Sequence, residues 1–263
     1  MRGAEPEMKI YSWNMLFRNR ELDRAFDFIR NSEFDIFCLQ EVPEHFLPCL
    51  KALPYHVAEA IDVERLSSPD EPLHLVTLSR YPIVNQKIVP FPEYWPLLSL
   101  RTRVFVHLMR LFHWSKIKNR TNLYVDIAAP AGTIRVFNLH TALTRMDLRV
   151  KEFETVLAER DPSLPTIVCG DFNTIESPRV SLLNWLLGGP VSHAINYTLE
   201  RTHIEKRFME HELHNPLRGQ VTHLFADSQL DHILVSRSFT ITSASVLPDR
   251  VGSDHHPIRV HAI

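Results

Sequence analysis

The sequence predicts a mixed α/β fold in a single domain. Apolar segments of strand length alternate with segments of helical period through the first two thirds of the chain, which is typical of an α/β core. Strand-like segments separated only by short turns follow toward the C-terminus, and this spacing indicates antiparallel pairing. We therefore expect mixed β-sheets in one domain at residues 8–263, after a polar tail at residues 1–7.

The expected elements are bounded by polar clusters. The early strands cover residues 9–14, 34–41, 134–140 and 166–173, and the late strands cover 230–236, 239–247 and 257–262. Helices are expected at residues 21–31 and 145–160, where apolar residues recur on one face. Residues 83–121 are long for a connection, and residues 188–222 read as irregular structure with room for one short helix.

Composition excludes several classes of site. The 263 residues include only 7 glycines, and neither G-x-G-x-x-G nor G-x-x-x-x-G-K can be written from them, which excludes the standard dinucleotide and P-loop sites. The 3 cysteines form no C-x-x-C pair, so neither a disulfide framework nor a structural zinc site is indicated. The N-terminus lacks the apolar core of a signal peptide, and we expect a cytoplasmic protein.

Polar side chains mark the ends of the expected strands. Asn14 and Glu41 close two early strands, and Asp171 and Asn173 follow a later one at a spacing that places both on one side of an extended segment. Two late strands instead begin after their polar clusters. If they run antiparallel to the early strands, one pocket gathers Asn14, Glu41, His140, Asp171, Asn173, Asp231, Asp254 and His255.

This pocket has the chemistry of a metal site. Its four carboxylates would repel one another unless a cation neutralised them. Because the ligands are oxygens and no thiolate is present, the cation should be Mg²⁺, with Mn²⁺ as a substitute, held by Glu41 with Asn14 and Asp254 nearby. The other groups suit attack of water on phosphorus, since Asp231 can orient the His255 imidazole while Asn173 and His140 donate to phosphoryl oxygens.

A series of motifs in this order carries a family resemblance. The motifs are Trp13-Asn14, Leu39-Gln40-Glu41-Val42, Leu78-Ser79-Arg80-Tyr81-Pro82-Ile83, Asn138-Leu139-His140-Thr141, Gly170-Asp171-Phe172-Asn173, Leu230-Asp231-His232-Ile233 and Gly252-Ser253-Asp254-His255-His256-Pro257-Ile258. Over residues 8–263 they resemble the endonuclease/exonuclease/phosphatase superfamily. The resemblance implies a DNase I-like four-layer α/β/β/α sandwich and Mg²⁺-dependent hydrolysis of phosphate esters without a covalent intermediate.

The resemblance also assigns roles to the polar residues. Glu41 and Asn14 match the metal site, with Asp254 near it, while Asp171 and Asn173 match the pair that positions the attacking water. Asp231 and His255 match the family's acid–histidine dyad, and His140 matches the histidine that binds the phosphate or protonates the leaving group. Whether Asp171 or His255 takes the proton of the water stays open.

The histidine at position 140 bears on the substrate. Asn138-Leu139-His140 is similar to the branch that contains pancreatic-type deoxyribonucleases, sphingomyelinases, deadenylases, inositol-phosphate phosphatases and tyrosyl-DNA phosphodiesterases. We expect a phosphodiesterase, first a nuclease or DNA-end-processing enzyme. The alternatives are a phospholipid or sphingomyelin-type phosphodiesterase, an inositol-phosphate phosphatase, and a non-catalytic binding module, which would require the site to be eroded.

Residues 94–125 contain six basic residues and no acidic one. Within them Leu100, Val104, Leu108, Leu111 and Phe112 approximate a helical apolar stripe. Three interpretations stay open: a helix packed on the sheet edge with a solvated basic face, an arm that guides nucleic acid, or an amphipathic helix on an anionic membrane. In the second, the substrate-binding residues are Arg101, Arg103, Lys116 and Lys118. No protein partner is indicated, and we expect a monomer.

The other histidines are interpreted as structural. His211-Glu-Leu-His214 resembles a zinc helix, but its second histidine comes one residue too early. His256 should point away from the side of the chain that carries His255. Hydrogen bonding at the surface or in the core is expected for His193, His203, His223 and His232.

Overall fold

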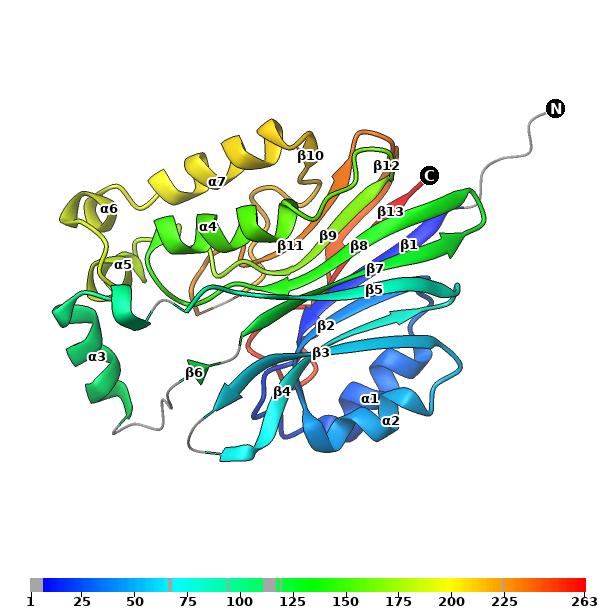
Figure 1. Ribbon diagram of the computed structural model, residues 1–263, viewed down its shortest axis with the longest axis horizontal. Coiled ribbons are helices and arrows are strands. Elements are labelled where there is room, and N and C mark those ends of the chain that lie inside the picture. The colour runs from blue at the N-terminus through cyan, green and yellow to red at the C-terminus, as the bar shows by residue number, and fades with distance from the viewer. Residues whose placement is uncertain (1–6, 66–67, 94, 111–116, 119, 224) are drawn as a thin grey trace.

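Two β-sheets face each other in this computed structural model, and helices cover their outer faces (Figure 1). The structure describes residues 7–65, 68–93, 95–110, 117–118, 120–223 and 225–263. Within these residues one sheet has seven strands in the order β12-β13-β1-β2-β4-β3-β6, and the other has six in the order β10-β11-β9-β8-β7-β5.

The seven-stranded sheet combines both ends of the chain with the first half of the sequence. It contains β1 (Met8–Asn14), β2 (Ile36–Pro43), β3 (His56–Arg65), β4 (Ser68–Ser79), β6 (Ile117–Lys118), β12 (Ile241–Val246) and β13 (Ile258–Ala262). The six-stranded sheet contains β5 (Ile83–Pro90), β7 (Thr121–Ala129), β8 (Gly132–His140), β9 (Thr166–Asp171), β10 (Leu213–His214) and β11 (Asp231–Ser236). Strands β1 and β2 pair in parallel, as do β8 and β9, whereas β9 and β11 pair antiparallel, so the expectation of mixed sheets is confirmed.

The helices form the outer layers. They are α1 (Leu22–Asn31), α2 (Leu47–Lys51), α3 (Leu100–Arg110), α4 (Met146–Leu157), α5 (Ser181–Leu186), α6 (Val191–Ile195) and α7 (Leu199–Glu210), with short 3₁₀ turns η1 (Glu44–Phe46) and η2 (Trp95–Leu97). Helix α1 packs Ala25 and Ile29 on the outer face of the seven-stranded sheet. Phe153 of α4 and Phe208 of α7 pack on the outer face of the six-stranded sheet. This arrangement is the four-layer sandwich.

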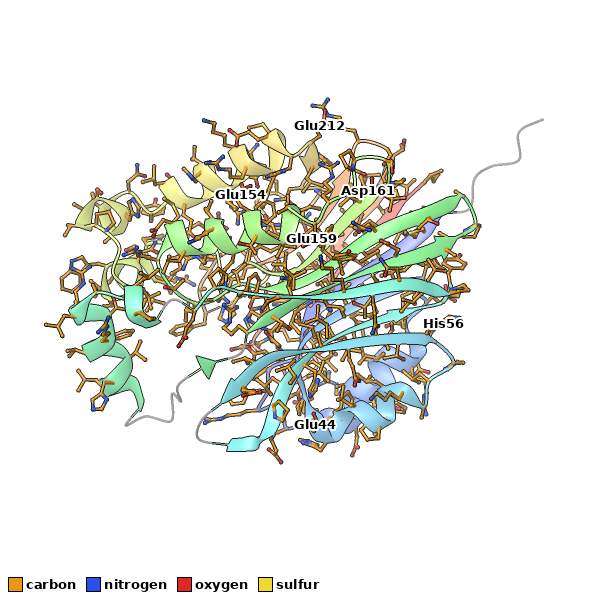
Figure 2. The ribbon with its side chains drawn as sticks, in the orientation of Figure 1. Glu44, His56, Glu154, Glu159, Asp161 and Glu212 are labelled. Carbon is orange, nitrogen blue, oxygen red and sulfur yellow. The ribbon has the colours of Figure 1, made fainter. Side chains whose placement is uncertain are left out.

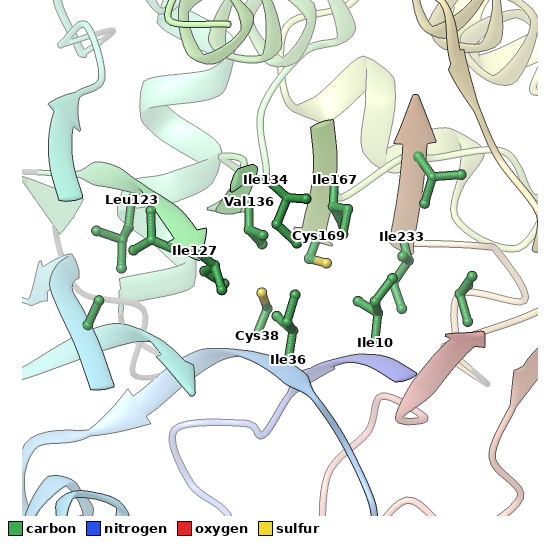
Figure 3. Packing of buried hydrophobic residues seen from close by; sticks show 14 of the residues in the cluster. Ile10, Ile36, Cys38, Leu123, Ile127, Ile134, Val136, Ile167, Cys169 and Ile233 are labelled. Atoms are coloured by element: carbon green, nitrogen blue, oxygen red, sulfur yellow. The ribbon is translucent and has the colours of Figure 1, made fainter. Parts of the chain in front are cut away.

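Side chains fill the space between the two sheets (Figure 2). Ile10, Ile36 and Cys38 of the seven-stranded sheet meet Ile167 and Cys169 of the six-stranded sheet in one buried apolar cluster (Figure 3). All five side chains are fully buried. This core holds the two sheets together and so fixes the strand ends that carry the polar clusters. Among the described residues, no helix is long and apolar enough to cross a membrane.

The sequence-based assignment misses several elements. Helix α7 has twelve residues in a segment expected to be largely irregular. Its buried side includes Glu200 and Glu205, which pair with Arg149 and Arg201. Because charged residues occupy buried positions, the apolar period of this helix is broken. The strands β3 and β4 were also not expected, although every strand and helix that was expected is present.

Candidate active site

The expected polar residues converge because of strand register. Asp171 at the end of β9 lies opposite Asp231 in the antiparallel pair with β11 and beside His140 in the parallel pair with β8. In the other sheet, the parallel pair of β1 and β2 aligns Asn14 with Gln40, next to Glu41. Both sheets therefore contribute to one cluster at the same edge.

Asp171 lies at the centre of this cluster. Its Oδ2 atom is 3.1 Å from Asn14 Nδ2, 3.6 Å from His140 Nε2 and 3.7 Å from His255 Nε2. Burial raises the pKa of Asp171, but the charges of His255 and His140 and the hydrogen bonds from Asn173 and Asn14 outweigh it and leave the pKa lowered. The arrangement thus favours an ionised carboxylate among hydrogen-bond donors.

Each of the two imidazoles is held by a buried carboxylate. His255 Nδ1 donates to Asp231 Oδ2 at 2.8 Å, and His140 Nδ1 donates to Asp62 Oδ2 at 2.8 Å. These bonds leave both Nε2 atoms facing Asp171. Burial lowers the pKa of both imidazoles, but the carboxylates outweigh it and raise the pKa of His255 to about 10 and that of His140 to about 9.

Asp62 is a site residue that the sequence analysis missed. It is fully buried and lies on β3 where the pairing with β4 shifts register, a bulge of the kind that redirects a side chain. Ala58 and Ala60 precede it at the buried, inward positions of the same strand. The alternation of Ala58, Ala60 and Asp62 places a carboxylate at the next inward position. This alternation indicates Asp62 only once β3 is assigned as a strand.

Asn14 and Glu41 lie together, as expected. Asn14 Nδ2 is 3.3 Å from Glu41 Oε1, and Glu41 Oε2 accepts a hydrogen bond from the backbone N–H of Phe17 at 3.0 Å. Glu41 Oε1 also lies 3.9 Å from His140 Nε2. The backbone of Glu41 has φ +55°, a conformation that costs about 1–3 kcal/mol for a residue other than glycine and is concentrated at functional sites.

Asn173 reaches the cluster by a turn. The chain leaves β9 at Asp171, and Asn173 has φ +48°, so the expectation of an extended segment at this point is wrong. The N–H of Asn173 donates to Asp171 Oδ1 at 2.8 Å, which is the hydrogen bond of an Asx turn. Its side-chain Nδ2 donates to the Thr141 carbonyl at 2.8 Å.

His223 also belongs to the site, contrary to its interpretation as an ordinary structural histidine. Its ring packs edge-on against the His255 ring with centroids 4.6 Å apart. Its Nε2 lies 3.5 Å from Asp254 Oδ2, and its Nδ1 accepts the backbone N–H of Ala226. A neutral His223 therefore carries its proton on Nε2, facing Asp254. The Asp254 side chain is 46% exposed, and its Oδ1 lies 3.9 Å from His255 Nε2.

The four basic residues predicted to bind substrate differ in how they are placed. Arg101 donates to the Gly189 carbonyl and stacks 4.3 Å from the centre of the Trp185 ring. Arg103 donates to the carbonyls of Leu98 and Pro96. Lys116 lies outside the described residues, and of Lys118 the structure describes only the backbone, in β6.

The helical period seen in the sequence is confirmed by α3, but the apolar stripe of this helix does not pack as expected. Leu100, Val104 and Leu108 of the apolar stripe are 78%, 49% and 51% exposed, whereas Thr102 is buried. The interpretation in which this stripe packs on a sheet edge is therefore wrong for these three residues. Leu111 and Phe112 of the same stripe lie outside the described residues.

The remaining histidines keep structural roles. His256 Nδ1 donates to the Leu247 carbonyl, on the other side of the chain from the His255 contacts. His232 is fully buried and takes a hydrogen bond from Arg201. His211 contacts Glu154. In the part of the chain that the structure describes, neither His211 nor His214 belongs to a group of side chains close enough to share a metal ion.

The residues present fit a divalent cation. Ligand atoms of Asp171, Asp231 and His255 lie within 4.8 Å of one another, as do those of His223, Asp254 and His255. Of the two carboxylates expected to hold the metal, Asp254 belongs to one of these groups and Glu41 to neither. Asp231 Oδ1 and Asp254 Oδ1 are buried and accept no hydrogen bond from the described residues. Carboxylate oxygens without hydrogen-bond donors are ligands that hard divalent cations take.

Comparison with known proteins agrees with the fold and the motifs. The model of the Endonuclease/Exonuclease/phosphatase family matches residues 11–255. The chain belongs to this family. Members of the family are phosphoesterase hydrolases, and this protein has their fold. Among curated proteins, none matches the chain.

Solved structures show the same architecture. An endonuclease/exonuclease/phosphatase from Beutenbergia cavernae superimposes with a TM-score of 0.72 at 18% identity, over 98% of this chain and 72% of that one. The mannosyl-6-phosphatase Bt3783 of Bacteroides thetaiotaomicron gives 0.62 at 17% identity, over 97% and 99%. ANGEL2, a 2',3'-cyclic phosphatase, gives 0.61 at 17% identity, over 97% and 95%. At these identities the likeness shows the fold alone.

Proposed function

We propose that this protein is a divalent-metal-dependent phosphoesterase that cleaves a phosphodiester by direct attack of water. One observation carries the proposal: Asp171 Oδ2 lies 3.6 Å and 3.7 Å from the Nε2 atoms of His140 and His255. A buried carboxylate backs each imidazole on its far nitrogen. One acceptor is thus placed between two donors, as hydrolysis at phosphorus requires.

The proton transfers follow from this arrangement. Asp171 accepts a proton from the attacking water as the new P–O bond forms. His255 Nε2 donates a hydrogen bond to a phosphoryl oxygen, and His140 Nε2 gives its proton to the ester oxygen that leaves. Asp171 suits the role of base better than His255, because the bond to Asp231 favours the charged imidazolium form of His255, which has no lone pair to accept a proton.

Glu41 would hold Mg²⁺ or Mn²⁺, with Asn14 beside it and Asp254 as a further candidate ligand. In this structure Asn14 turns Nδ2 toward Glu41 and Asp171 while its Oδ1 accepts the N–H of Leu16, so its amide would have to rotate to offer the oxygen to an ion. When bound, the ion neutralises charge on the phosphoryl oxygens. Glu41 Oε1 lies 3.3 Å from Asn14 Nδ2 and 3.9 Å from His140 Nε2. The metal ligands therefore lie beside the groups that transfer protons. Asp231 and Asp62 keep the two imidazoles in the orientation in which Nε2 faces the reaction.

The relatives leave the class of ester open, since one is named a mannosyl-6-phosphatase and another a 2',3'-cyclic phosphatase. We propose a diester, and the order of the motifs favours nucleic acid as its first candidate source. A phospholipid diester is the second candidate. It is favoured because Arg101 and Arg103 are bound to backbone carbonyls while the leucines beside them are exposed.

The test is hydrolysis of bis(p-nitrophenyl) phosphate with Mg²⁺, with Mn²⁺ and with EDTA. The wild type should be active only with metal, and Asp171→Asn and His255→Gln should each lose roughly a hundredfold or more in kcat. His256→Gln is the matched control, because this neighbouring histidine bonds to Leu247 instead. Activity in EDTA, or full activity of Asp171→Asn, would refute the mechanism. Single-stranded DNA, nicked duplex, RNA and lipid vesicles then identify the substrate class.

A further inference from the structure

Helix α3 leaves part of its apolar surface uncovered. Leu100, Val104 and Leu108 recur every fourth residue and are 78%, 49% and 51% exposed, so one aliphatic stripe faces solvent. Thr102, on the opposite side, is fully buried. An ordinary surface helix turns its apolar residues toward the core. In α3 the apolar residues are divided, because Phe105 and Val106 are half-buried while the aliphatic stripe faces solvent.

Polar contacts hold α3 in this orientation. The Thr102 hydroxyl bonds to Ser99 at 2.7 Å and packs so closely on Gly188 that a Cβ there would come within 2.7 Å of it. Arg101 donates to the Gly189 carbonyl at 2.9 Å and lies over the Trp185 ring. The buried side of the helix is therefore fixed to the segment between α5 and α6, and the exposure of the leucines follows from that docking.

The exposed aliphatic side chains continue onto the neighbouring helices. Leu182 of α5 is 62% exposed, and Val191 and Ile195 of α6 are 57% and 76% exposed. Helices α3, α5 and α6 lie together at one end of the molecule, on the left in Figure 1. We call the exposed residues Leu100, Val104, Leu108, Leu182, Val191 and Ile195 the apolar platform. Platforms of this kind mark interaction sites on soluble proteins.

The charge of these two segments points to an anionic partner. The chain has 31 acidic residues, but none lies in residues 94–125 or in residues 177–199, the two stretches that supply the platform. The acidic side chains of Glu154, Glu159, Asp161 and Glu212, labelled in Figure 2, lie over other elements, away from α3 and α6. The two stretches that supply the platform therefore contain no acidic residue of their own. The exposed Asp147 at the start of α4 is paired with Arg145, whose side chain packs beside Gly188.

We propose that the apolar platform seats the protein on the surface of an anionic lipid bilayer. Aliphatic side chains enter hydrocarbon, and the lack of acidic groups removes repulsion by lipid phosphates. Nucleic acid fits less well, because it is bound by free cations and stacked aromatic rings, whereas Arg101 and Arg103 donate to backbone carbonyls. A symmetric dimer through the platform would bring two copies of the same surface, with the same charge, against each other.

Further along the chain from α3, β6 and Arg120 contact elements of the candidate active site. The segment that carries α3 rejoins the sheets at β6, where Lys118 pairs with Glu64, two residues beyond Asp62. Arg120 follows and donates both to the His140 carbonyl and to Glu152.

Co-sedimentation with vesicles tests the proposal. The wild type should sediment with vesicles of phosphatidylcholine and phosphatidylserine, and the double variant Leu100→Gln/Leu108→Gln should bind roughly tenfold more weakly or not at all. Met209→Gln on α7 is the matched control, because Met209 is a helical residue that is 67% exposed and lies off the platform. It should bind as the wild type does.

Binding is measured without turnover, so an inactive enzyme would leave this result intact. Hydrolysis of bis(p-nitrophenyl) phosphate should be unchanged in the double variant, which shows that the fold is intact. Equal binding of wild type and double variant, or no binding of the wild type to anionic vesicles, would overturn the proposal. A dimer in sedimentation velocity that the double variant dissociates, without vesicle binding, would assign the platform to self-association instead.

Discussion

Asp62 is the residue whose removal tests the site most sharply. Its carboxylate accepts the Nδ1 hydrogen of His140 at 2.8 Å and is fully buried. Asp62→Asn keeps the shape but removes the charge that favours the protonated imidazole. We expect kcat to fall roughly a hundredfold, with little change in KM, since Asp62 acts through His140. Steady-state kinetics on a chromogenic diester measures both constants.

The control for Asp62 lies on the same strand. Glu59 of β3 pairs with Lys51 at the surface, and Glu59→Gln should keep wild-type kinetics. Circular dichroism should show the same folded state for both variants. If Asp62→Asn retains full kcat, His140 needs no carboxylate partner and its proposed role as a proton donor fails.

Single residues were predictable from sequence where a motif marks a strand end. Glu41 and Asp171 were found this way, because each comes directly after an apolar run, near the end of its strand. Asp62 and His223 were not, because their roles come from partners far away in the sequence, His140 and Asp254. Such pairings are set by the register between strands and by loop packing, which no local pattern encodes.

At the scale of the element, the parallel pair of β8 and β9 depends on one glycine. Gly170 has φ +143°, and a Cβ at this position would lie 1.8 Å from the Leu139 carbonyl oxygen. The two strands can approach this closely only without a side chain. Because Gly170 immediately precedes Asp171, the same approach sets the position of the proposed base.

Gly170→Ala should therefore destabilise the protein by about 3 kcal/mol and also reduce kcat. Gly132 separates the backbone cost from the clash, because it has a similar φ of +136° but open space where its Cβ would be. Gly132→Ala should cost only the backbone strain, about 1 kcal/mol, and leave kcat unchanged. Urea unfolding gives both values. Equal losses in the two variants would show that close strand approach is not the cause.

Whole elements were predictable where the apolar period is unbroken. Helices α1 and α4 were found because their buried positions carry apolar side chains such as Ile29 and Phe153. Helix α7 was missed because Glu200 and Glu205 are buried against arginines. Helix α3 has the expected period with the opposite orientation. Periodicity identifies a helix, but the side that faces the protein depends on what the neighbouring elements offer.

At the scale of the whole molecule, a formal net charge of −2 conceals two opposite regions. Carboxylates from both sheets meet at the candidate active site, and the two stretches that supply the apolar platform contain no acidic residue. The carboxylates of the first region can bind a cation. The second region can approach an anionic surface without repulsion from acidic residues of its own. The two sheets are thus joined twice, by the apolar core between them and by the polar cluster at their shared edge.

A bound divalent ion should therefore stabilise the whole sandwich. A ligand at a hundred times its Kd adds about 2.7 kcal/mol, which for a domain of this size corresponds to a rise in Tm of roughly 5 °C or more. Thermal unfolding in EDTA and in excess Mg²⁺ measures the rise. Glu41→Gln should abolish most of it, whereas Glu44→Gln, a half-exposed residue on the neighbouring turn, should preserve it. An equal rise in the Glu41 variant would place the stabilising ion elsewhere, and the two sheets would then be held at this edge by hydrogen bonds alone.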